Sequence, residues 1–433
     1  MGSTSASQGV PLTAENGVYD SGGDLMLHVG PEMARFRVCS KTLARSSPVF
    51  KRMLYGNFAE SKPSDGAKWV VRLPEDGARA MAIFLSIIHG KFHVTPETLS
   101  VRDLYDLLTL TEKYDATALL RPYAHRWIDA VGSEMDDPYL LCVAWELGHI
   151  ELFEKMMVAI TRDCTVHEDG MLLYGRPTSD SSSCTSDATV CLEPDKELEI
   201  SCSFDVNSMS QRATHLDNSW TFPLDSILHL QPDNMIEIIK KNRMVLVQEY
   251  LKPYLKLYDT LARGRCTVDL GRREHLTSIE EHSACDAMAF GSLFKAFQSL
   301  GHNITLPGIA QRYNGSFTDL FCVLPRIKIL SHHFDCIKSF AVELRQGDQR
   351  AGEKCKQLGF ITPSQLRYLN KQAVKMGFPT RNSEIKADDE VMGFLTRNLD
   401  RKAKEEVFWG QARRVEQPAV PWGQGQHANS SWW

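Results

Sequence analysis

The stretch SKTLARSSPVFKRMLYGNFAESK, residues 40–62, decides the fold of the first third of the chain. Pro48 cannot lie inside a helix, because it lacks an N–H and its ring clashes with the preceding turn, but it suits the first helical position. Ser46 or Ser47, just before it, can accept hydrogen bonds from the free N–H groups of a helix start. The sequence therefore predicts two short helices that meet at a corner.

The segments around this corner predict short strands followed by helices. Residues 24–29 (DLMLHV) and 34–39 (ARFRVC) are apolar or alternating, and Gly30 and Pro31 separate them, which is typical of a β-hairpin. Residues 68–73 (KWVVRL) predict another strand, and several amphipathic helices follow. Strands first and then a run of short helices indicate an α+β fold.

Five segments resemble the BTB/POZ domain in their order and spacing. They are DLMLHVG, FRVCSKTLARSSPVFKRML, GNFAESK, VVRLPED and LLTLTEKYDATALL, and the resemblance covers about residues 24–129. One departure is Ser40, where the family usually has a histidine before Lys41. The resemblance implies an N-terminal interaction domain of short strands with a cluster of helices. Apolar residues recur at helical offsets in residues 221–345, and this layout is similar to the mainly α-helical C-terminal region of BTB proteins common in filamentous fungi.

The face shared by the hairpin and the two short helices is where the resemblance implies a homodimer interface. Apolar side chains recur there at helical offsets, and a stable contact buries on the order of 1,200–2,000 Å² in total. The residues that we expect at this interface are Leu43, Phe50, Met53, Leu54, Tyr55 and Phe58. The alternative is that these side chains fill the domain's own core, which we expect for Phe50 and Leu54.

The composition divides the chain into parts, because segments with helical periodicity alternate with polar segments that have none. We expect a disordered N-terminus (1–23), the BTB/POZ domain (24–129), a helical extension (130–164), a Ser/Asp-rich linker (165–220), a helical C-terminal domain (221–345), further helices (346–413) and a flexible tail (414–433).

Charge and cysteine content narrow the class of partner and the compartment. The formal net charge of the 433 residues is −5, which does not favour nucleic acid or an anionic membrane as the main partner. The 11 cysteines are odd in number and widely spaced, and no secretion signal is apparent. These features indicate an intracellular protein of the cytoplasm or the nucleus. No apolar run is long enough to predict a membrane-spanning helix.

Motifs of catalysis and nucleotide binding are absent: the sequence contains no GxxxxGK[ST], GxSxG or HExxH pattern. We therefore expect a non-enzymatic protein with no cofactor, apart from a tentative structural zinc site. Its ligands would be Cys266, Cys285, His332 and Cys336, in which His332 and Cys336 share one helix face at i and i+4, or His333 in place of His332. Free buried cysteines and a surface histidine pair explain the same residues equally simply.

The sequence leaves several functions open. The first is a scaffold or adaptor that self-associates through the N-terminal domain and holds an unknown protein partner through its helical region. The second is a substrate adaptor for a cullin-3 ubiquitin ligase, although Asp103-Leu104-Tyr105 stands where the family's supporting motif has a hydrophobic residue and then an acid. The third is a nuclear transcriptional co-regulator, without a visible Lys/Arg-rich run. The fourth is a thiol or metal enzyme at the His332–Cys336 cluster.

Overall fold

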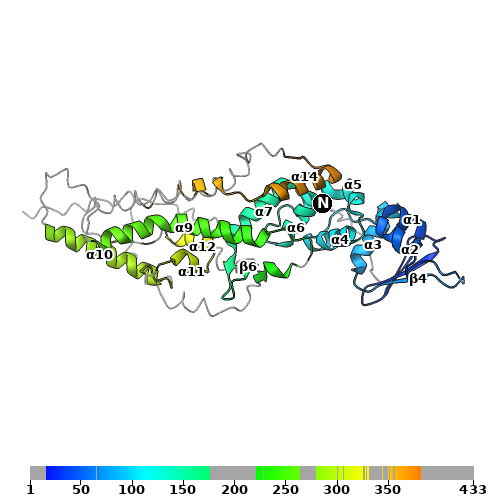
Figure 1. Cartoon of the computed structure of the whole chain (residues 1–433), viewed down its shortest axis with the longest axis horizontal. Coiled ribbons are helices and arrows are strands. Elements are labelled where there is room, and N and C mark those ends of the chain that lie inside the picture. The colour runs from blue at the N-terminus through cyan, green and yellow to red at the C-terminus, as the bar shows by residue number, and fades with distance from the viewer. Residues whose placement is uncertain are drawn as a thin grey trace, which may run out of the picture. The chain divides into compact units, whose positions relative to one another are not determined.

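The computed structural model (Figure 1) describes residues 16–64, 66–175, 221–227, 229–263, 279–299, 301–305, 307–324 and 356–381, with isolated positions between 327 and 354. The expected tail (414–433), most of the expected linker and the predicted helix beyond residue 383 lie outside the described residues.

The hairpin predicted around Gly30 is present and forms the centre of a four-stranded sheet. β2 (Leu25–Val29) pairs antiparallel with β3 (Ala34–Val38). β4 (Val70–Leu73) runs parallel to β2, and β1 (Asn16–Val18) runs parallel to β3, which gives the order β1-β3-β2-β4. Alternate residues of β2 and β3 are buried, so the sheet has one core face and one outward face.

Strand β1 corrects the expected disordered N-terminus (1–23). The ring of Tyr19 packs edge-on against Phe36, with 5.8 Å between centroids. The backbone N–H of Tyr19 donates to the carbonyl of Arg37 at 2.9 Å. These contacts fix the end of β1 on β3. The small, polar composition of this segment gave no sign of the strand, because its order comes from contacts with β3 and not from its own periodicity.

Helices cover the core face of the sheet, which confirms the α+β class. They are α1 (Ser40–Ser46), α2 (Pro48–Tyr55), α3 (Ala78–Ile88), η1 (Phe92–Val94), α4 (Val101–Lys113), η2 (Thr117–Leu120) and α5 (Arg121–Val131). In α3, seven consecutive residues from Ala80 to Ser86 are buried, which places this helix in the centre of the domain. The hydrophobic burial of strands and helices in one core holds the domain together.

The predicted helical extension is present as α6 (Tyr139–Leu147) and α7 (Ile150–Asp163). A second, three-stranded sheet follows, formed by β5 (Thr165–Val166), β6 (Leu172–Gly175) and β7 (Thr221–Pro223). The expected linker (165–220) is therefore wrong for its first residues, because β6 pairs antiparallel with both of the other strands.

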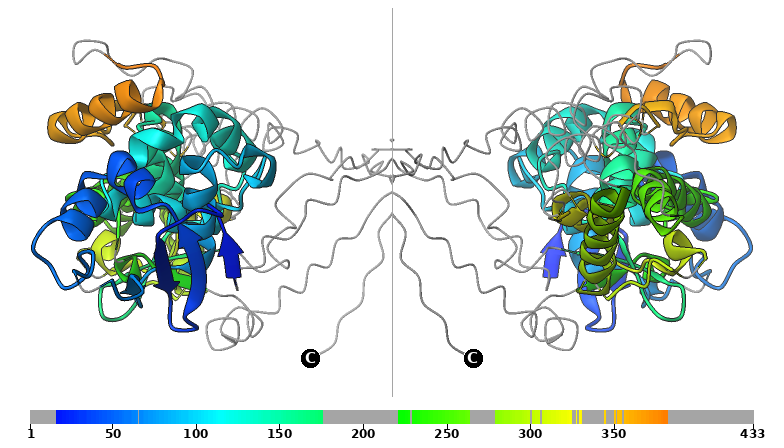
Figure 2. Two further views of the ribbon diagram at one scale, coloured as in Figure 1. Left: turned by 90° about the vertical axis from the view of Figure 1, so that its right-hand side faces the viewer. Right: turned by 90° about the vertical axis from the view of Figure 1, so that its left-hand side faces the viewer.

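The described residues from 224 to 381 are mainly helical, as expected. It contains η4 (Leu224–Ser226), α9 (Met235–Ala262), α10 (Ile279–Ser299), α11 (Ile309–Arg312), α12 (Phe317–Val323) and α14 (Pro363–Met376). α9 continues through Pro253, and α9 and α10 lie side by side in Figures 1 and 2. Ser316 caps α12 by accepting from the N–H of Asp319 at 2.9 Å, as its position in the sequence predicts.

Helix α14 packs against α6 and α7, far away in the sequence (Figure 1). The close approach depends on Gly148, which ends α6 with φ +72°. A Cβ there would lie 2.2 Å from the backbone nitrogen of Ala373, so only glycine leaves room for the α14 backbone. The start of α14 carries a capping box between Thr362 and Gln365.

Candidate protein-interaction surface

The corner between α1 and α2 is fixed by Ser47. Its hydroxyl accepts from the N–H of Phe50 at 3.0 Å, which caps α2, and donates to the carbonyl of Tyr114 at 2.6 Å. Pro48 occupies the first helical position, as the sequence predicts. One serine therefore both starts α2 and attaches it to the end of α4.

The inner face of the corner belongs to the domain's own core. Leu43, Phe50 and Leu54 have no exposed surface, and the ring of Phe50 stacks on Tyr114 with 4.0 Å between centroids. The prediction that these three residues line an interface is wrong, because fully buried side chains cannot contact a second chain. For Phe50 and Leu54 the alternative reading as core residues is correct.

The outer face of the corner is apolar and exposed. Tyr55 is 48% exposed, Phe58 is 54% exposed and Val49 is 38% exposed, and Met53, one turn after Val49, is half-buried. We call these four residues the corner surface. Helical periodicity placed both Met53 and Leu54 on the apolar face, but it could not tell that Leu54 is buried and Met53 is partly exposed. The sequence analysis did not include Val49 among the interface residues, although Val49 lies one turn before Met53.

The loop after α2 holds Phe58 in its exposed position. The hydroxyl of Ser61 donates to the carbonyls of Met53, at 3.3 Å, and Gly56, and it accepts from the N–H of Phe58 at 3.2 Å. The indole of Trp69 donates to the carbonyl of Glu60 at 2.8 Å. The exposure of Phe58 is thus a property of an ordered loop.

Ser40, the departure from the family pattern, is the centre of a hydrogen-bonded group. Its N–H and hydroxyl donate to the two carboxylate oxygens of Asp24, at 2.9 and 2.8 Å, and its hydroxyl lies 2.7 Å from that of Tyr55. Partial burial acts to raise the pKa of Asp24, but the hydrogen bonds from Ser40, with the charge of Lys62, outweigh it and the pKa is lowered. The substitution is therefore accommodated by a complete local network.

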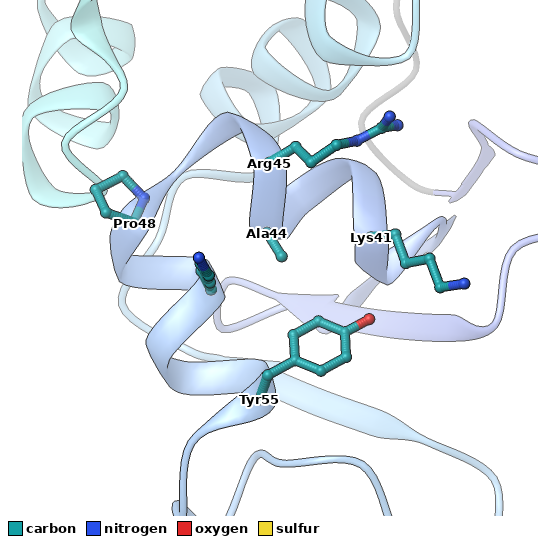
Figure 3. A pocket seen from close by; sticks show the side chains of 6 residues that line it. Lys41, Ala44, Arg45, Pro48 and Tyr55 are labelled. Atoms are coloured by element: carbon teal, nitrogen blue, oxygen red, sulfur yellow. The ribbon is translucent and has the colours of Figure 1, made fainter.

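A hollow of about 600 Å³ opens beside the corner surface (Figure 3). Its lining consists of Lys41, Ala44, Arg45, Pro48, Lys51 and Tyr55. None of the three cations forms an ion pair with a described carboxylate. Lys41 and Arg45 stand at i and i+4 on α1, so they lie on one side of the helix. This spacing is visible in the sequence, but the sequence alone did not predict that both residues line a hollow.

The segment that replaces the cullin-supporting motif is covered by the chain itself. Asp103, Leu104 and Tyr105 lie in the first turns of α4, where Leu104 is fully buried. The Tyr105 hydroxyl donates to the carbonyl of His229 at 2.9 Å, and Asp103 pairs with Arg79 at 2.6 Å. These three side chains are already engaged within the chain.

The tentative zinc site stays a prediction. Cys266, His332, His333 and Cys336 lie outside the described residues, as does the side chain of Cys285, whose backbone belongs to α10. Among the side chains that are described, no three His, Cys, Asp or Glu groups converge as a metal site requires. Within the same residues, no helix has both the length and the apolar character that a membrane crossing needs.

Comparison with known proteins agrees with this geometry. The family model of the BTB/POZ domain matches residues 20–126, the part of the chain that contains the four-stranded sheet and the corner. No curated protein and no solved structure matches the chain.

Proposed function

Residues 20–126 form a BTB/POZ domain, and from this premise we propose that the chain is a non-enzymatic, intracellular adaptor that self-associates through its corner surface. Such a domain is a protein-interaction module. Self-association places two copies of the helical region, which we propose holds a further protein partner, in one complex and so raises the effective concentration of whatever that region binds.

The exposed apolar side chains around α2 are the observation that carries this proposal. Within the described part of the chain nine large hydrophobic residues are exposed, and Val49, Tyr55 and Phe58 are three of them within ten residues of sequence. Exposed apolar side chains concentrated in one short ordered segment are typical of an interaction site. Met53, half-buried in the same helix, adds an adaptable side chain.

The charges beside the corner surface restrict what covers it. Lys41, Arg45 and Lys51 surround the hollow, and none of them pairs with a carboxylate in the part of the chain that the structure describes. Like charges brought together by a two-fold axis repel each other, so a second copy has to meet this hollow with acidic residues. Asp24, exposed and hydrogen-bonded through Ser40 to Tyr55, is a carboxylate at the edge of the same surface.

Light scattering of the full chain at concentrations from about 1 to about 100 µM tests the proposal. We expect the mass of a dimer for the natural chain and a monomer for Val49→Asp combined with Phe58→Asp, since two buried carboxylates without partners oppose association. Phe92→Asp is the matched control, because Phe92 is 65% exposed in η1 and should leave the dimer intact. A natural chain that remains monomeric throughout this range would refute the proposal.

The other functions left open by the sequence gain no support from the residues that the structure describes. A cullin-3 adaptor would have to use a surface other than Asp103–Tyr105, whose side chains are engaged within the chain. We therefore retain protein binding with self-association as the proposed function, and the cullin and nuclear functions as alternatives that co-purification and localisation experiments distinguish.

A further inference from the structure

The outward face of the four-stranded sheet carries an arginine on each of the two strands that flank β2. Arg35 of β3 lies opposite His28 of β2, and His28 lies opposite Arg72 of β4. Both arginines are exposed and His28 is half-buried. Neighbouring strands are about 4.8 Å apart, so these side chains form one contiguous line, which we call the basic row.

No negative charge of the described chain compensates the basic row. None of its members forms an ion pair with a described carboxylate, and the Nδ1 atom of His28 is buried without a hydrogen-bond partner among the described residues. Burial lowers the pKa of His28, and the charges of Arg35 and Arg72 lower it further, so both guanidinium groups act on the same imidazole. His28 is therefore neutral at physiological pH, and the charges of the basic row are those of Arg35 and Arg72 on the two flanking strands. Both guanidinium groups are exposed and have no described carboxylate partner, so they are available to a bound anion.

The surroundings of the basic row suit an extended peptide. Arg37 lies two residues from Arg35 on the same face of β3 and donates from Nε to the carbonyl of Gly23 at 3.0 Å. This two-residue interval is the interval at which an extended peptide presents alternate side chains to one face. The next cross-strand row contains Arg37, Met26 and Val70, and Val70 is 41% exposed, so apolar surface lies beside the charges.

The same features argue against nucleic acid. The outward positions of β2, β3 and β4 are Met26, His28, Arg35, Arg37, Val70 and Arg72, and they include no Phe, Tyr or Trp on which bases could stack. An arginine fork binds a carboxylate in bidentate geometry without any stacking partner, so this face suits an acidic peptide.

We propose that this outward face binds an extended acidic peptide segment of a partner protein, with alternate Asp or Glu carboxylates on Arg35, Arg37 and Arg72 and an apolar side chain on Met26 and Val70. The corner surface is built on α1 and α2, which continue into the core through Leu43 and Leu54, whereas the basic row lies on the opposite side of the sheet. The two surfaces are therefore separate, and this binding activity goes beyond self-association.

Fluorescence anisotropy with a labelled peptide, Glu-Ser-Glu-Val-Glu-Ser-Glu-Val, tests the proposal on the full chain. We expect saturable binding that weakens as salt rises from about 50 to about 500 mM, because exposed charges are screened. Arg35→Gln combined with Arg72→Gln should weaken binding about tenfold or more, which corresponds to about 1.4 kcal/mol or more. The same double variant should melt within about 1 °C of the natural temperature, because neither exposed arginine forms an ion pair with a described carboxylate. A residue with a purely structural role would lower the melting temperature when replaced.

Controls separate charge from position and separate this site from the dimer. Lys240→Gln removes an exposed cation from α9 and should leave the affinity for the peptide unchanged. The arginine variants should keep the molecular mass of the natural chain in light scattering, so failure of either proposal is visible without the other. Equal affinity of the natural chain and the double variant would overturn the proposal. So would equal binding of a Lys-for-Glu peptide, or binding of a duplex oligonucleotide or anionic phosphatidylserine vesicles without binding of the acidic peptide.

Discussion

The hydroxyl groups of Ser40 and Tyr55 lie 2.7 Å apart, which joins the first turn of α1 to the last turn of α2. Ser40 has no exposed surface and also donates twice to Asp24. Tyr55 is thereby held with its ring on the outside of the corner. It belongs to the corner surface and also lines the hollow of Figure 3. The position at which the chain departs from its family is therefore one that orients a proposed interface residue.

Ser40→Ala tests this group through stability and pH. At neutral pH we expect a loss of about 1–2 kcal/mol, because the Asp24 carboxylate and the Tyr55 hydroxyl lose their shared partner. The pKa of Asp24 is lowered in the folded state, so its contribution is present above the unfolded pKa of about 3.9 and is lost as pH falls through the folded value. The difference in melting temperature between the natural chain and Ser40→Ala should therefore be present at neutral pH and should shrink at acid pH. Ser64→Ala, at an exposed serine, is the control; a deficit that is equal at all pH values would exclude Asp24 as the cause.

Gly148→Ala should release α14 from α6. The added methyl group would lie 2.2 Å from the backbone nitrogen of Ala373, and the backbone has φ +72°, so the new residue is strained as well as crowded. We expect faster amide hydrogen exchange in residues 363–376, with the BTB/POZ domain unchanged. Gly170→Ala is a matched control: its φ is +82°, but nothing lies within 4 Å of the added Cβ, so it costs only the backbone strain, about 1 kcal/mol. Equal exchange of α14 in both variants would show that crowding at Gly148 is not what matters.

Local signals in the sequence were sufficient to predict the two helices of the corner, but they could not predict which of the corner's side chains are buried. The effect of Pro48 and the cap at Ser47 act within one helical turn, so both could be predicted from adjacent residues. Whether Phe50 or Tyr55 faces the core depends on Tyr114, Phe84 and Trp69, which approach from distant parts of the chain. Periodicity defines an apolar face, but it does not tell whether the same chain buries that face.

The strands and dockings that the sequence did not reveal depend on long-range pairing. β5 and β7 have two and three residues, too few for a periodic pattern, and they become strands only because β6 pairs with both. The contact of Gly148 with Ala373 likewise joins segments more than two hundred positions apart. The sequence shows that His28, Arg35 and Arg72 are basic residues, but only the strand register places them side by side in the basic row.

Glu146 should make the docking of α14 depend on pH. It is 2% exposed on α6, and it accepts from the Tyr368 hydroxyl at 2.6 Å and from the Gln372 amide at 3.2 Å, both on α14. Burial raises the pKa of Glu146; the hydrogen bond from Tyr368 opposes this rise and the charge of Glu112 adds to it. A raised pKa means that the folded state favours the neutral acid, so docking should strengthen as pH falls from neutral toward the unfolded value of about 4.3.

Amide exchange protection of residues 363–376, corrected for the intrinsic pH effect, measures this dependence. The natural chain should gain protection between about pH 7.5 and pH 5.5. Glu146→Gln keeps an acceptor for Tyr368 but cannot titrate, so its protection should stay level. Glu151→Gln is the control, because Glu151 is an exposed acid at the start of the neighbouring helix α7. If the Glu146→Gln protein followed the same pH profile as the natural chain, another group would have to be responsible.

Arg243 should be the most costly single residue to remove from the helical region. It is 4% exposed in α9, and its Nη2 atom donates to the carbonyl of Tyr313 at 2.9 Å and to that of Gly315, while its Nε lies 3.4 Å from the carbonyl of Cys164. Its guanidinium also lies 5.6 Å from the centroid of the Tyr313 ring. One side chain thus ties α9 to the end of α7 and to the turn before α12.

Arg243→Met keeps most of the volume but leaves these buried carbonyls without a donor, so we expect a loss of about 3 kcal/mol or more. Arg243→Lys should recover only part of this loss, because an ammonium group cannot reproduce the planar fork that serves several carbonyls at once. Lys240→Met, on the exposed side of the same helix, should change stability by less than about 0.5 kcal/mol. Thermal unfolding followed by circular dichroism ranks the variants, and exchange in residues 235–262 localises the effect. If Arg243→Met and Lys240→Met melted together, the carbonyl contacts of Arg243 would contribute nothing to the stability of this region.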